Sequence, residues 1–388
     1  MHLVRIDAVS LDEGEAAVDL GQEPGDLVVL SFTDSDLASV GQAHAAEPGL
    51  PSLRLAKLAK LRHPLSVDLY VERVVARAKV VVIRCLGGLD YWRYGIERCA
   101  EAARAHGVVL AVLPGDDRPD PRLAAFSTDP DLAGQLDAYF RAGGPDNLRR
   151  MLRSLAIRLG GDGRVEPPQP LPRGFPWCPG CGVLPLETAL AAAGTAVPLA
   201  GARIAAEPVA LLLIYRSAVL GGDTGPFAAL AAALRARGIG VLPMAVSSLK
   251  EPQAAAAVAA AVRARRPDLV IAATAFSARE DETDFVLDAA DCPVLQAFTV
   301  GSPRAAWAAS ARGLGAADLA MQVALPEFDG RLSGFPISFK EESAEIAGFA
   351  ERRAVPYEAG IAALADRAWI FRTFRPAAKC NRIDAKAS

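Results

Sequence analysis

The stretch Val209-Ala-Leu-Leu-Leu-Ile214 decides the fold of this chain. A continuous apolar run of this kind predicts a strand that is buried on both faces, as in a parallel sheet. Similar runs follow along the chain at Val241–Val246, Asp268–Ala273 and Pro293–Phe298. Helical patterns over Phe227–Arg237 and Pro252–Arg265 lie between them. Strands and helices that alternate at this spacing predict an open parallel sheet with right-handed crossovers.

Polar and small residues follow each of the first three strands of this block. They are Tyr215-Arg216-Ser217, Gly221-Gly222-Asp223-Thr224-Gly225, Ser247-Ser248-Leu249-Lys250 and Thr274-Ala275-Phe276-Ser277. Ligands of open parallel sheets bind at the carboxyl ends of the strands, so the set predicts a binding site there. Any one of these residues also suits a turn or a helix cap, and that interpretation stays open for each of them.

A first α/β block precedes this one. Apolar runs at Asp26–Ser31, Lys79–Arg84 and Val108–Leu113 predict three strands. Helices are predicted over Tyr94–His106, with a stop at Gly107, and over Pro145–Leu159. We therefore predict an α/β protein with two flavodoxin- or Rossmann-like parallel-sheet blocks joined by a Pro-rich linker.

The linker is expected where proline and glycine concentrate, over residues 163–182. Four parts follow along the chain. They are an N-terminal α/β domain over 1–162, a Pro-rich linker or strap over 163–204, a second α/β domain over 205–357, and a helix with a tail over 358–388.

Composition excludes several classes of function. The chain has 388 residues and a net charge of −3, so no basic field favours a nucleic acid partner. No apolar run approaches the ~20 residues that cross a bilayer, and the N-terminus has no signal-peptide core. We therefore expect a soluble, cytoplasmic protein without a membrane span. Neither Gly-x-x-x-x-Gly-Lys-Ser/Thr nor Gly-x-Gly-x-x-Gly occurs, so neither P-loop ATP hydrolysis nor nicotinamide binding is supported.

Only two of the six cysteines, Cys178 and Cys181, are close in sequence. Scattered cysteines suit a reducing compartment. Trp177-Cys178-Pro179-Gly180-Cys181 superficially resembles a redox dithiol motif, which needs a strand directly before it and a helix directly after it. The surrounding prolines argue against both, and a structural zinc would need two more ligands. The leading interpretation is a pair of incidental cysteines in a loop.

A family resemblance rests on the order and spacing of several segments. They are Leu53-Arg-Leu-Ala56, Leu61-Arg-His-Pro-Leu-Ser-Val-Asp-Leu-Tyr70, Leu113-Pro-Gly-Asp-Asp-Arg-Pro-Asp120, Gly222-Asp-Thr224, Val246-Ser-Ser-Leu-Lys250, Ala273-Thr-Ala-Phe-Ser277 and Ala324-Leu-Pro-Glu-Phe-Asp-Gly-Arg331. The chain resembles the N-terminal half of cobaltochelatase large subunits and, more distantly, the large subunit of magnesium chelatase. The resemblance extends from about residue 1 to about residue 357, and family members are several times longer.

The resemblance implies a tetrapyrrole-binding subunit of an ATP-dependent cobaltochelatase, a ligase of cobalamin biosynthesis. Co²⁺ would be inserted into hydrogenobyrinic acid a,c-diamide, while ATP–Mg would be hydrolysed by partner subunits, an AAA+ ATPase and an integrin-like protein. Three alternatives stay open: a magnesium chelatase subunit acting on protoporphyrin IX, a non-catalytic tetrapyrrole-binding or docking fragment, and a periplasmic-type sensor. The lack of a signal peptide disfavours the last.

Metal insertion requires a base near neutral pKa and a transient metal ligand, normally His or Glu. The catalytic candidates are His63, Glu327 and Asp329, the last two expected on a loop after a strand. His63 equally suits a helix cap, and Glu327-x-Asp-Gly-Arg331 equally suits a turn with a salt bridge.

Arginine binds carboxylates in two places at once, which suits the acidic rim of such a macrocycle. The predicted substrate-binding residues are Arg84, Arg118, Arg216, Asp223, Ser247, Ser248, Lys250, Thr274, Phe276 and Arg331. Surface ion pairs are the alternative role for each of the cations.

Overall fold

The computed structural model describes residues 17–116, 118–179, 181–193, 208–277, 279, 285–311 and 313–372. The chain divides into two compact units. Unit 1 comprises Met1–Leu171, Leu220–Gly222 and Glu342–Arg352, and unit 2 comprises Pro172–Val219, Asp223–Glu341 and Arg353–Ser388. Each unit is built on a parallel sheet of its own, which confirms the predicted fold class.

The sheet of unit 1 has four parallel strands in the order β2-β1-β3-β4. The strands are β1 (Leu27–Ser31), β2 (Leu53–Lys57), β3 (Val80–Cys85) and β4 (Val109–Pro114). Every residue of β1 and β3 is buried, which is why both strands are apolar except for Ser31 and Arg84 near their carboxyl ends. The three predicted strands are confirmed. The edge strand β2 was missed as a strand because its Leu-Arg-Leu-Ala-Lys sequence buries one face more than the other.

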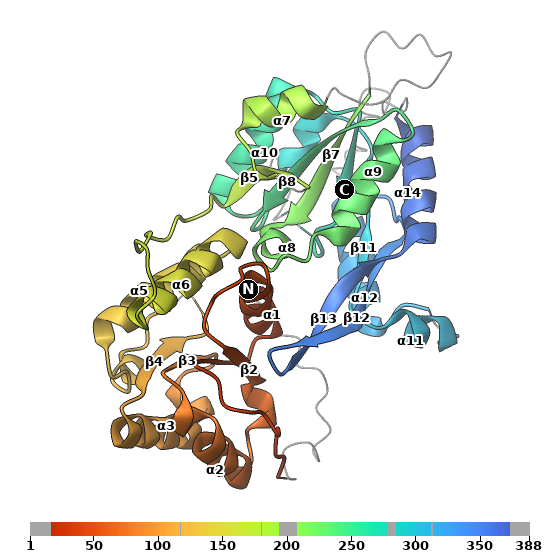
Figure 1. Cartoon of the computed structure of the whole chain (residues 1–388). Coiled ribbons are helices and arrows are strands. Elements are labelled where there is room, and N and C mark those ends of the chain that lie inside the picture. Colours follow the sequence, from red (N-terminus) through yellow and green to blue (C-terminus); the bar gives the residue numbers. More distant parts are fainter. Residues whose placement is uncertain are drawn as a thin grey trace, which may run out of the picture. The chain divides into compact units, whose positions relative to one another are not determined.

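Helices cover both faces of this sheet (Figure 1). Residues of α2 (Pro64–Arg73) and α3 (Arg93–His106) share a core with Val28 and Leu30, and residues of α1 (Asp34–Ala45), α5 (Pro130–Ala142) and α6 (Pro145–Arg158) share one with Leu27 and Val29. Successive residues of β1 therefore face opposite helix layers. The short helix α4 (Pro121–Ala124) follows β4.

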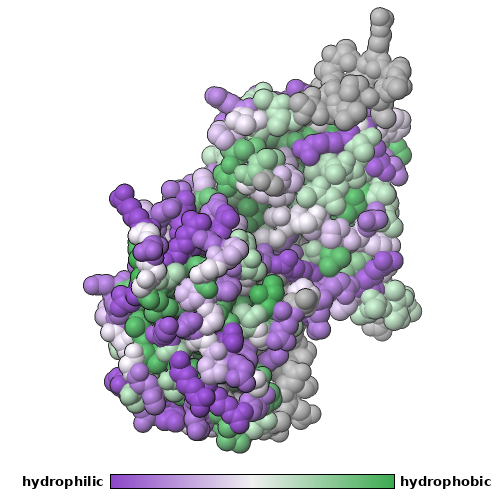
Figure 2. Space-filling model, viewed as in Figure 1, coloured by the Kyte–Doolittle hydropathy of each residue, from purple (hydrophilic) through white to green (hydrophobic). Residues whose placement is uncertain are grey.

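Two helix boundaries in unit 1 agree with the sequence signals. Gly107 adopts a φ of 70° directly after α3, the left-handed conformation that stops a helix without strain. Helix α6 begins at Pro145 and buries Leu148, Met151 and Leu155, while several of its arginines face outwards. Figure 2 shows hydrophilic surface over this helix.

The main sheet of unit 2 has the order β10-β9-β7-β8-β5-β6. Its parallel strands are β7 (Val209–Tyr215), β8 (Gly240–Val246), β9 (Leu269–Ala272) and β10 (Val294–Gln296). An antiparallel edge follows, made by β5 (Gly174–Cys178) on β8 and by β6 (Gly182–Val183) on β5. In the parallel part of this sheet, the first strand along the chain, β7, lies between the second, β8, and the third, β9. In unit 1, β1 likewise lies between β2 and β3. This is the order of flavodoxin-like doubly wound sheets.

Helices also cover both faces of this second sheet. Helices α7 (Leu186–Ala193) and α10 (Pro252–Ala264) share a core with Leu211 and Leu213. Helices α9 (Gly225–Arg235) and α14 (Glu358–Phe371) lie side by side on the other side (Figure 1). No helix among the described residues is long and apolar enough to span a bilayer.

A small third sheet has the order β11-β12-β13, from β11 (Phe298–Val300), β12 (Pro336–Ile346) and β13 (Phe349–Pro356). Phe298, Val300 and Phe339 form its apolar cluster, against which Trp307 and Tyr357 pack. The remaining short elements of unit 2 are α8 (Arg216–Leu220), a 3-10 helix over Val286–Ala290, α11 (Arg304–Ala309), α12 (Ala316–Leu319), a π-helical turn over Ala320–Ala324, and α13 (Leu325–Glu327).

Three local expectations need correction. The fourth strand, expected over Pro293–Phe298, is split at Ala297, so that β10 and β11 lie in different sheets. The loop expected after β7 begins with helix α8. The Pro-rich strap expected over 163–204 contains β5, β6 and α7, whereas residues 163–173 form no helix or strand. Proline is tolerated in β5 because pairing on β8 leaves it close to the edge of the sheet.

Candidate functional site

The candidate site of unit 2 lies where the strand order reverses, between β7 and β9. Crevices at the carboxyl ends of such strands are where doubly wound sheets bind ligands. Tyr215 ends β7, Thr274 follows β9, and Gln296 ends β10. Because these strands are parallel neighbours, their ends meet at one edge of the sheet.

A buried polar network occupies this edge. Arg331 donates hydrogen bonds to the Thr274 carbonyl oxygen at 2.8 Å, to Gln296 Oε1 at 3.0 Å and to Asp329 Oδ2 at 2.7 Å. Asp329 Oδ1 accepts from Ser277 Oγ at 2.6 Å and from the backbone N–H of Arg279 at 3.0 Å. We call Thr274, Ser277, Gln296, Asp329 and Arg331 the buried arginine network.

Burial sets the electrostatics of this network. The Arg331 and Asp329 side chains are 1% and 0% exposed. Loss of water lowers the pKa of Arg331, while the nearby carboxylate of Asp329 opposes that change by favouring the charged guanidinium. Burial also raises the pKa of Tyr215 to about 12, and its hydroxyl donates to the Ala275 carbonyl oxygen at 2.8 Å. The network holds the loops after β9 and β10 and the segment after α13 in one arrangement.

Phe276 lies beside this network in an unusual backbone conformation. Its φ of 63° falls in the left-handed region, which a bulky residue rarely adopts. Its N–H donates to the Met321 carbonyl oxygen at 2.9 Å, so the loop after β9 is tied to the π-helical turn. This hydrogen bond therefore fixes the backbone that carries the half-buried Phe276 ring.

The polar residues after β7 and β8 have partners within unit 2. Arg216 is half-buried, and its Nε donates to the Pro172 carbonyl oxygen at 2.9 Å. Ser247 Oγ donates to Glu251, and Ser248 Oγ accepts from the N–H of Lys250 at 3.2 Å. Lys250 itself is exposed. Arg216 and Lys250 are therefore the predicted cations of this block that water still reaches.

The side chain of Asp223 bonds to two strands of the third sheet. Its Oδ1 accepts from the N–H of Ala354 at 2.8 Å, and its other oxygen accepts from Lys340 Nζ. Because β12 and β13 supply these two partners, Asp223 has a structural role in holding that pair of strands. Substrate binding by Asp223 stays a prediction.

Unit 1 also has a buried arginine, which lies near the carboxyl end of a central strand of its sheet. Arg84, near the end of β3, pairs with Asp36 at 2.5 Å, and Asp36 also accepts from Ser31 Oγ at 2.8 Å. The Arg84 guanidinium lies 4.4 Å from the centre of the Phe140 ring. Burial raises the pKa of Asp36, and the charge of Arg84 and the bond from Ser31 oppose this. Arg84, like Arg331, therefore has an internal carboxylate partner, and rim contact by either stays a prediction.

The other candidates lie apart from these networks. His63 is the N-cap of α2, where its Nδ1 accepts from the N–H of Leu65 at 3.2 Å. Arg118 is exposed, and its N–H donates to Asp116 Oδ1 at 3.0 Å. Glu327 is exposed at the end of α13, where its Oε1 accepts from Ser333 Oγ at 3.0 Å. A helix, rather than the expected strand, precedes Glu327 and Asp329, because Leu325-Pro-Glu continues the π-helical turn.

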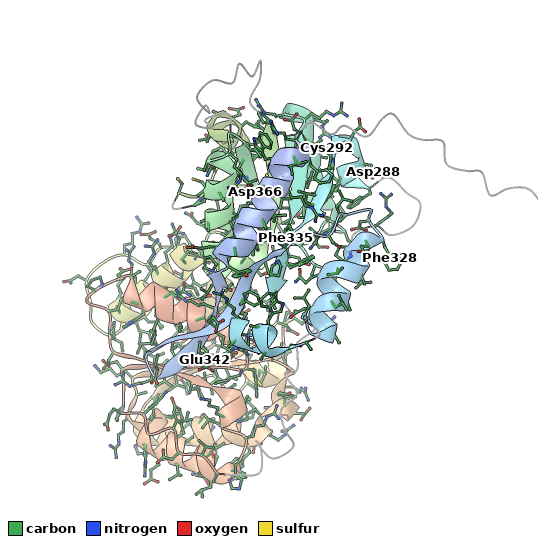
Figure 3. All side chains as sticks on the ribbon, turned by 90° about the vertical axis from the view of Figure 1, so that its right-hand side faces the viewer. Asp288, Cys292, Phe328, Phe335, Glu342 and Asp366 are labelled. Carbon is green, nitrogen blue, oxygen red and sulfur yellow. The ribbon has the colours of Figure 1, made fainter. Side chains whose placement is uncertain are left out.

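Apolar side chains are also exposed beside this segment. Phe328 is 75% exposed, and Figure 3 shows it at the edge of unit 2. Among the described residues, no group of three or more His, Cys, Asp or Glu side chains is arranged to hold a metal ion.

The structure thus brings together only part of the predicted set. Thr274, Asp329 and Arg331 meet in one network, whereas His63, Arg84 and Arg118 lie in unit 1. Sequence reasoning missed Gln296 and Asp36. Gln296 is a polar residue at the end of an apolar strand and is followed by further apolar residues, which signals a buried hydrogen-bonded position. Asp36 falls in the first turn of the helix after β1 and had no comparable signal.

Comparisons with known proteins agree on one relationship. A family model described as CobN/Magnesium Chelatase matches residues 137–382. The chain is 42% identical over 348 residues to the aerobic cobaltochelatase subunit CobN of Sinorhizobium sp, and 38% identical over 344 residues to the protein of the same name from Pseudomonas aeruginosa. Both alignments cover 88% of this chain and 27% of the relative.

A solved structure is also similar. The catalytic subunit of cobaltochelatase from Mycobacterium tuberculosis matches with a TM-score of 0.65 at 29% identity, over 87% of this chain and 26% of that one. The chain therefore spans about a quarter of the length of the relatives that it matches.

Proposed function

Because the chain belongs to the CobN/magnesium chelatase family, we propose that it is the N-terminal portion of the tetrapyrrole-binding large subunit of a cobaltochelatase. The observation that carries this proposal is the 42% identity to a cobaltochelatase subunit over 88% of the chain. The substrate would be hydrogenobyrinic acid a,c-diamide, and Co²⁺ would be the second substrate. We place the reaction in the cytoplasm.

The chain's part in this reaction would be to hold the macrocycle by its rim. Arg216 and Lys250 follow neighbouring strands, β7 and β8, and neither is fully buried. Rim carboxylates would accept charge-assisted hydrogen bonds from them. The buried arginine network would act indirectly, because it fixes the loop that carries Phe276. The Phe276 ring would offer an apolar surface to a flat ligand.

Proton removal from the ring nitrogens and the cleavage of ATP would need more than these groups. Glu327 is the exposed carboxylate among the catalytic candidates, and a base of this kind accepts ring protons only when the macrocycle lies within hydrogen-bond reach. The sequence has no P-loop motif, so ATP–Mg would be hydrolysed by partner subunits, an AAA+ ATPase and an integrin-like protein.

A second candidate follows from the family description, which also includes magnesium chelatase. That function would use protoporphyrin IX, which carries two carboxylates, and Mg²⁺. A chain selected for a substrate with many rim carboxylates and amides should bind the corrin precursor more tightly, because each additional rim group can be paired.

The test is a titration of the purified chain with hydrogenobyrinic acid a,c-diamide and, in parallel, with protoporphyrin IX. Absorbance of the macrocycle and quenching of tryptophan fluorescence report binding. Saturable binding of the corrin precursor with a Kd of about 1 μM or below, and at least tenfold weaker binding of the porphyrin, would support the proposal. The reverse preference would favour the magnesium branch. A folded chain that binds neither macrocycle would leave a docking role, which retention on immobilised ATPase subunits would test.

A further inference from the structure

Cys178 and Cys181 lie at the two ends of the turn between β5 and β6. Cys178 is the last residue of β5, and Cys181 directly precedes the first residue of β6. The N–H of Cys181 donates to the Cys178 carbonyl oxygen at 3.2 Å, which closes the turn. The two Sγ atoms are 2.8 Å apart. The expectation that both cysteines lie in a loop is therefore wrong for Cys178, which is part of strand β5.

The separation of the sulfur atoms favours one chemistry over another. Two thiolates that share one tetrahedral zinc at ~2.3 Å each lie about 3.8 Å apart. A disulfide requires ~2.05 Å. The 2.8 Å separation is nearer to the length of a disulfide than to the spacing of two zinc-bound thiolates. Among the described residues, no third ligand completes a metal site around the pair.

The surroundings make the pair both fixed and accessible. Strand β5 pairs with β8 from Gly174 to Pro176, and the side chains of Phe175 and Trp177 are buried. The backbone below the turn is therefore held, so that its two cysteines stay close. Cys181 is exposed and Cys178 is half-buried. A reagent in water thus meets Cys181 first.

Two of the three other described cysteines are less reactive than this pair. Cys85 and Cys99 are buried, and burial raises the pKa of both thiols to about 12. Their thiolates are scarce at neutral pH, so neither competes for an oxidant. Burial also raises the pKa of Cys178, and the neighbouring Cys181 thiol adds to this. Cys181 is the more exposed of the two thiols and is therefore the attacking group.

We propose that Cys178 and Cys181 form a reversible dithiol–disulfide site that reacts with small-molecule disulfides of the glutathione class. The Cys181 thiolate attacks one sulfur of the small disulfide, whose S–S bond breaks and whose other half leaves as a thiol. The Cys178 thiolate then attacks the sulfur of Cys181 and expels the second half as a thiol. Two protein thiols are oxidised, one small disulfide is reduced to two thiols, and each thiol that leaves takes up a proton released by a cysteine.

The experiment uses the full chain in buffers with different ratios of reduced to oxidised glutathione. Samples are quenched in acid, alkylated, and analysed by intact mass and by peptide mapping. We expect the oxidised chain to lose two hydrogen masses, with Cys178 joined to Cys181, and the linked fraction to return to zero in excess reduced glutathione. Cys85 and Cys99 should be alkylated only after denaturation.

Variants separate the two thiols. In Cys178→Ser the attack can start but not finish, so Cys181 should accumulate a mixed disulfide with glutathione. Cys181→Ser should react at least tenfold more slowly, because the remaining thiol is half-buried. Cys292→Ser is the matched control and should form the same internal link as the unsubstituted chain.

Three results would overturn the proposal. One is a chain whose Cys178 and Cys181 both stay alkylatable in the most oxidised buffer. Another is a link to Cys292 or Cys380 in place of the internal one. The third is one zinc ion per chain that survives dialysis and protects both thiols, which would make the pair part of a metal site. None of these readouts depends on macrocycle binding, so the test is independent of the proposed function.

Discussion

Arg331 and Asp329 form an ion pair with an Nη2–Oδ2 distance of 2.7 Å, in which neither side chain is more than 1% exposed. Charges removed from water in this way are stable only while they are paired and hydrogen-bonded. The Thr274 carbonyl oxygen and the Gln296 amide oxygen accept further hydrogen bonds from the guanidinium. Arg331 Nε has no hydrogen-bond partner among the described residues. The pair therefore links the loops at the carboxyl edge of the unit 2 sheet.

Loss of one partner should remove the ion pair while the other charged side chain stays buried. Asp329→Asn is expected to destabilise unit 2 by about 3–5 kcal/mol, and Arg331→Met by a similar amount. The double variant should lose less than the sum of the two, because no charge remains unpaired. Urea unfolding followed by circular dichroism measures all three. Arg266→Met, which breaks the exposed pair with Asp291, is the control and should cost less than about 1 kcal/mol. Additive losses would mean that the pair is not coupled.

Asp26 should make the stability of unit 1 sensitive to acid. The Ser52 hydroxyl, followed by the Lys79 ammonium, lowers the pKa of Asp26 from 3.8 to about 2. A carboxylate whose pKa is depressed by folding adds stability above its unfolded pKa, and that stability is lost as the pH falls from 3.8 to about 2. Because the side chain is 31% exposed, screening reduces the contribution to about 1 kcal/mol.

Asp26→Asn tests this dependence. The variant should be less stable than the unsubstituted chain at neutral pH and equal to it at about pH 2. Urea midpoints of both chains at the two pH values measure the difference in stability. For each chain, the value at neutral pH is compared with the value at about pH 2. A deficit that persists unchanged in acid would show that Asp26 acts through packing and not through its charge.

His63 is expected to act as a helix cap. Its Nδ1 accepts from the N–H of Leu65, so His63→Ala should cost about 1 kcal/mol of stability, while His63→Ser should restore most of it. Thermal unfolding separates the two variants. Both should bind hydrogenobyrinic acid a,c-diamide as the unsubstituted chain does. A loss of binding in His63→Ser without a loss of stability would return His63 to the list of site residues.

Two helical glycines should respond in opposite directions to alanine. A Cβ at Gly134, in α5, meets no atom within 4 Å, so Gly134→Ala should stabilise the chain by about 1 kcal/mol through helix propensity. A Cβ at Gly360, in α14, would lie 1.7 Å from the Pro336 carbonyl oxygen. Gly360→Ala should therefore destabilise by about 1–3 kcal/mol, because α14 must move away from β12. Melting temperatures of the two variants check this contrast, which equal shifts would contradict.

Arg216 and Lys250 should matter for binding more than for stability. Arg216→Gln and Lys250→Gln are each expected to weaken binding of hydrogenobyrinic acid a,c-diamide about tenfold, since each removes a charge-assisted hydrogen bond worth ~1.5 kcal/mol. Arg263→Gln, an exposed position on α10, is the matched control and should leave the Kd unchanged. Equal effects in all three variants would indicate nonspecific attraction, which added salt would remove.

Most of the strands that build the two sheets are predictable from the amino-acid sequence. The runs Val80–Ile83 and Val209–Ile214 are apolar throughout because parallel strands are covered on both faces, and this local pattern is visible without a structure. Family membership was likewise predictable, because the order and spacing of the matching segments survive in the linear chain.

Which polar residues meet depends on how distant segments fold together and is not predictable from the sequence. Thr274 and Gln296 lie 57 and 35 positions from Arg331 along the chain, and nothing in their own segments indicates that one guanidinium bonds to both of them. The structure likewise decided that Arg84 and Arg331 are buried, because burial depends on which helices cover the strand ends. Local propensity fixes strands and caps, whereas the charge and exposure of a side chain depend on distant segments that fold against it.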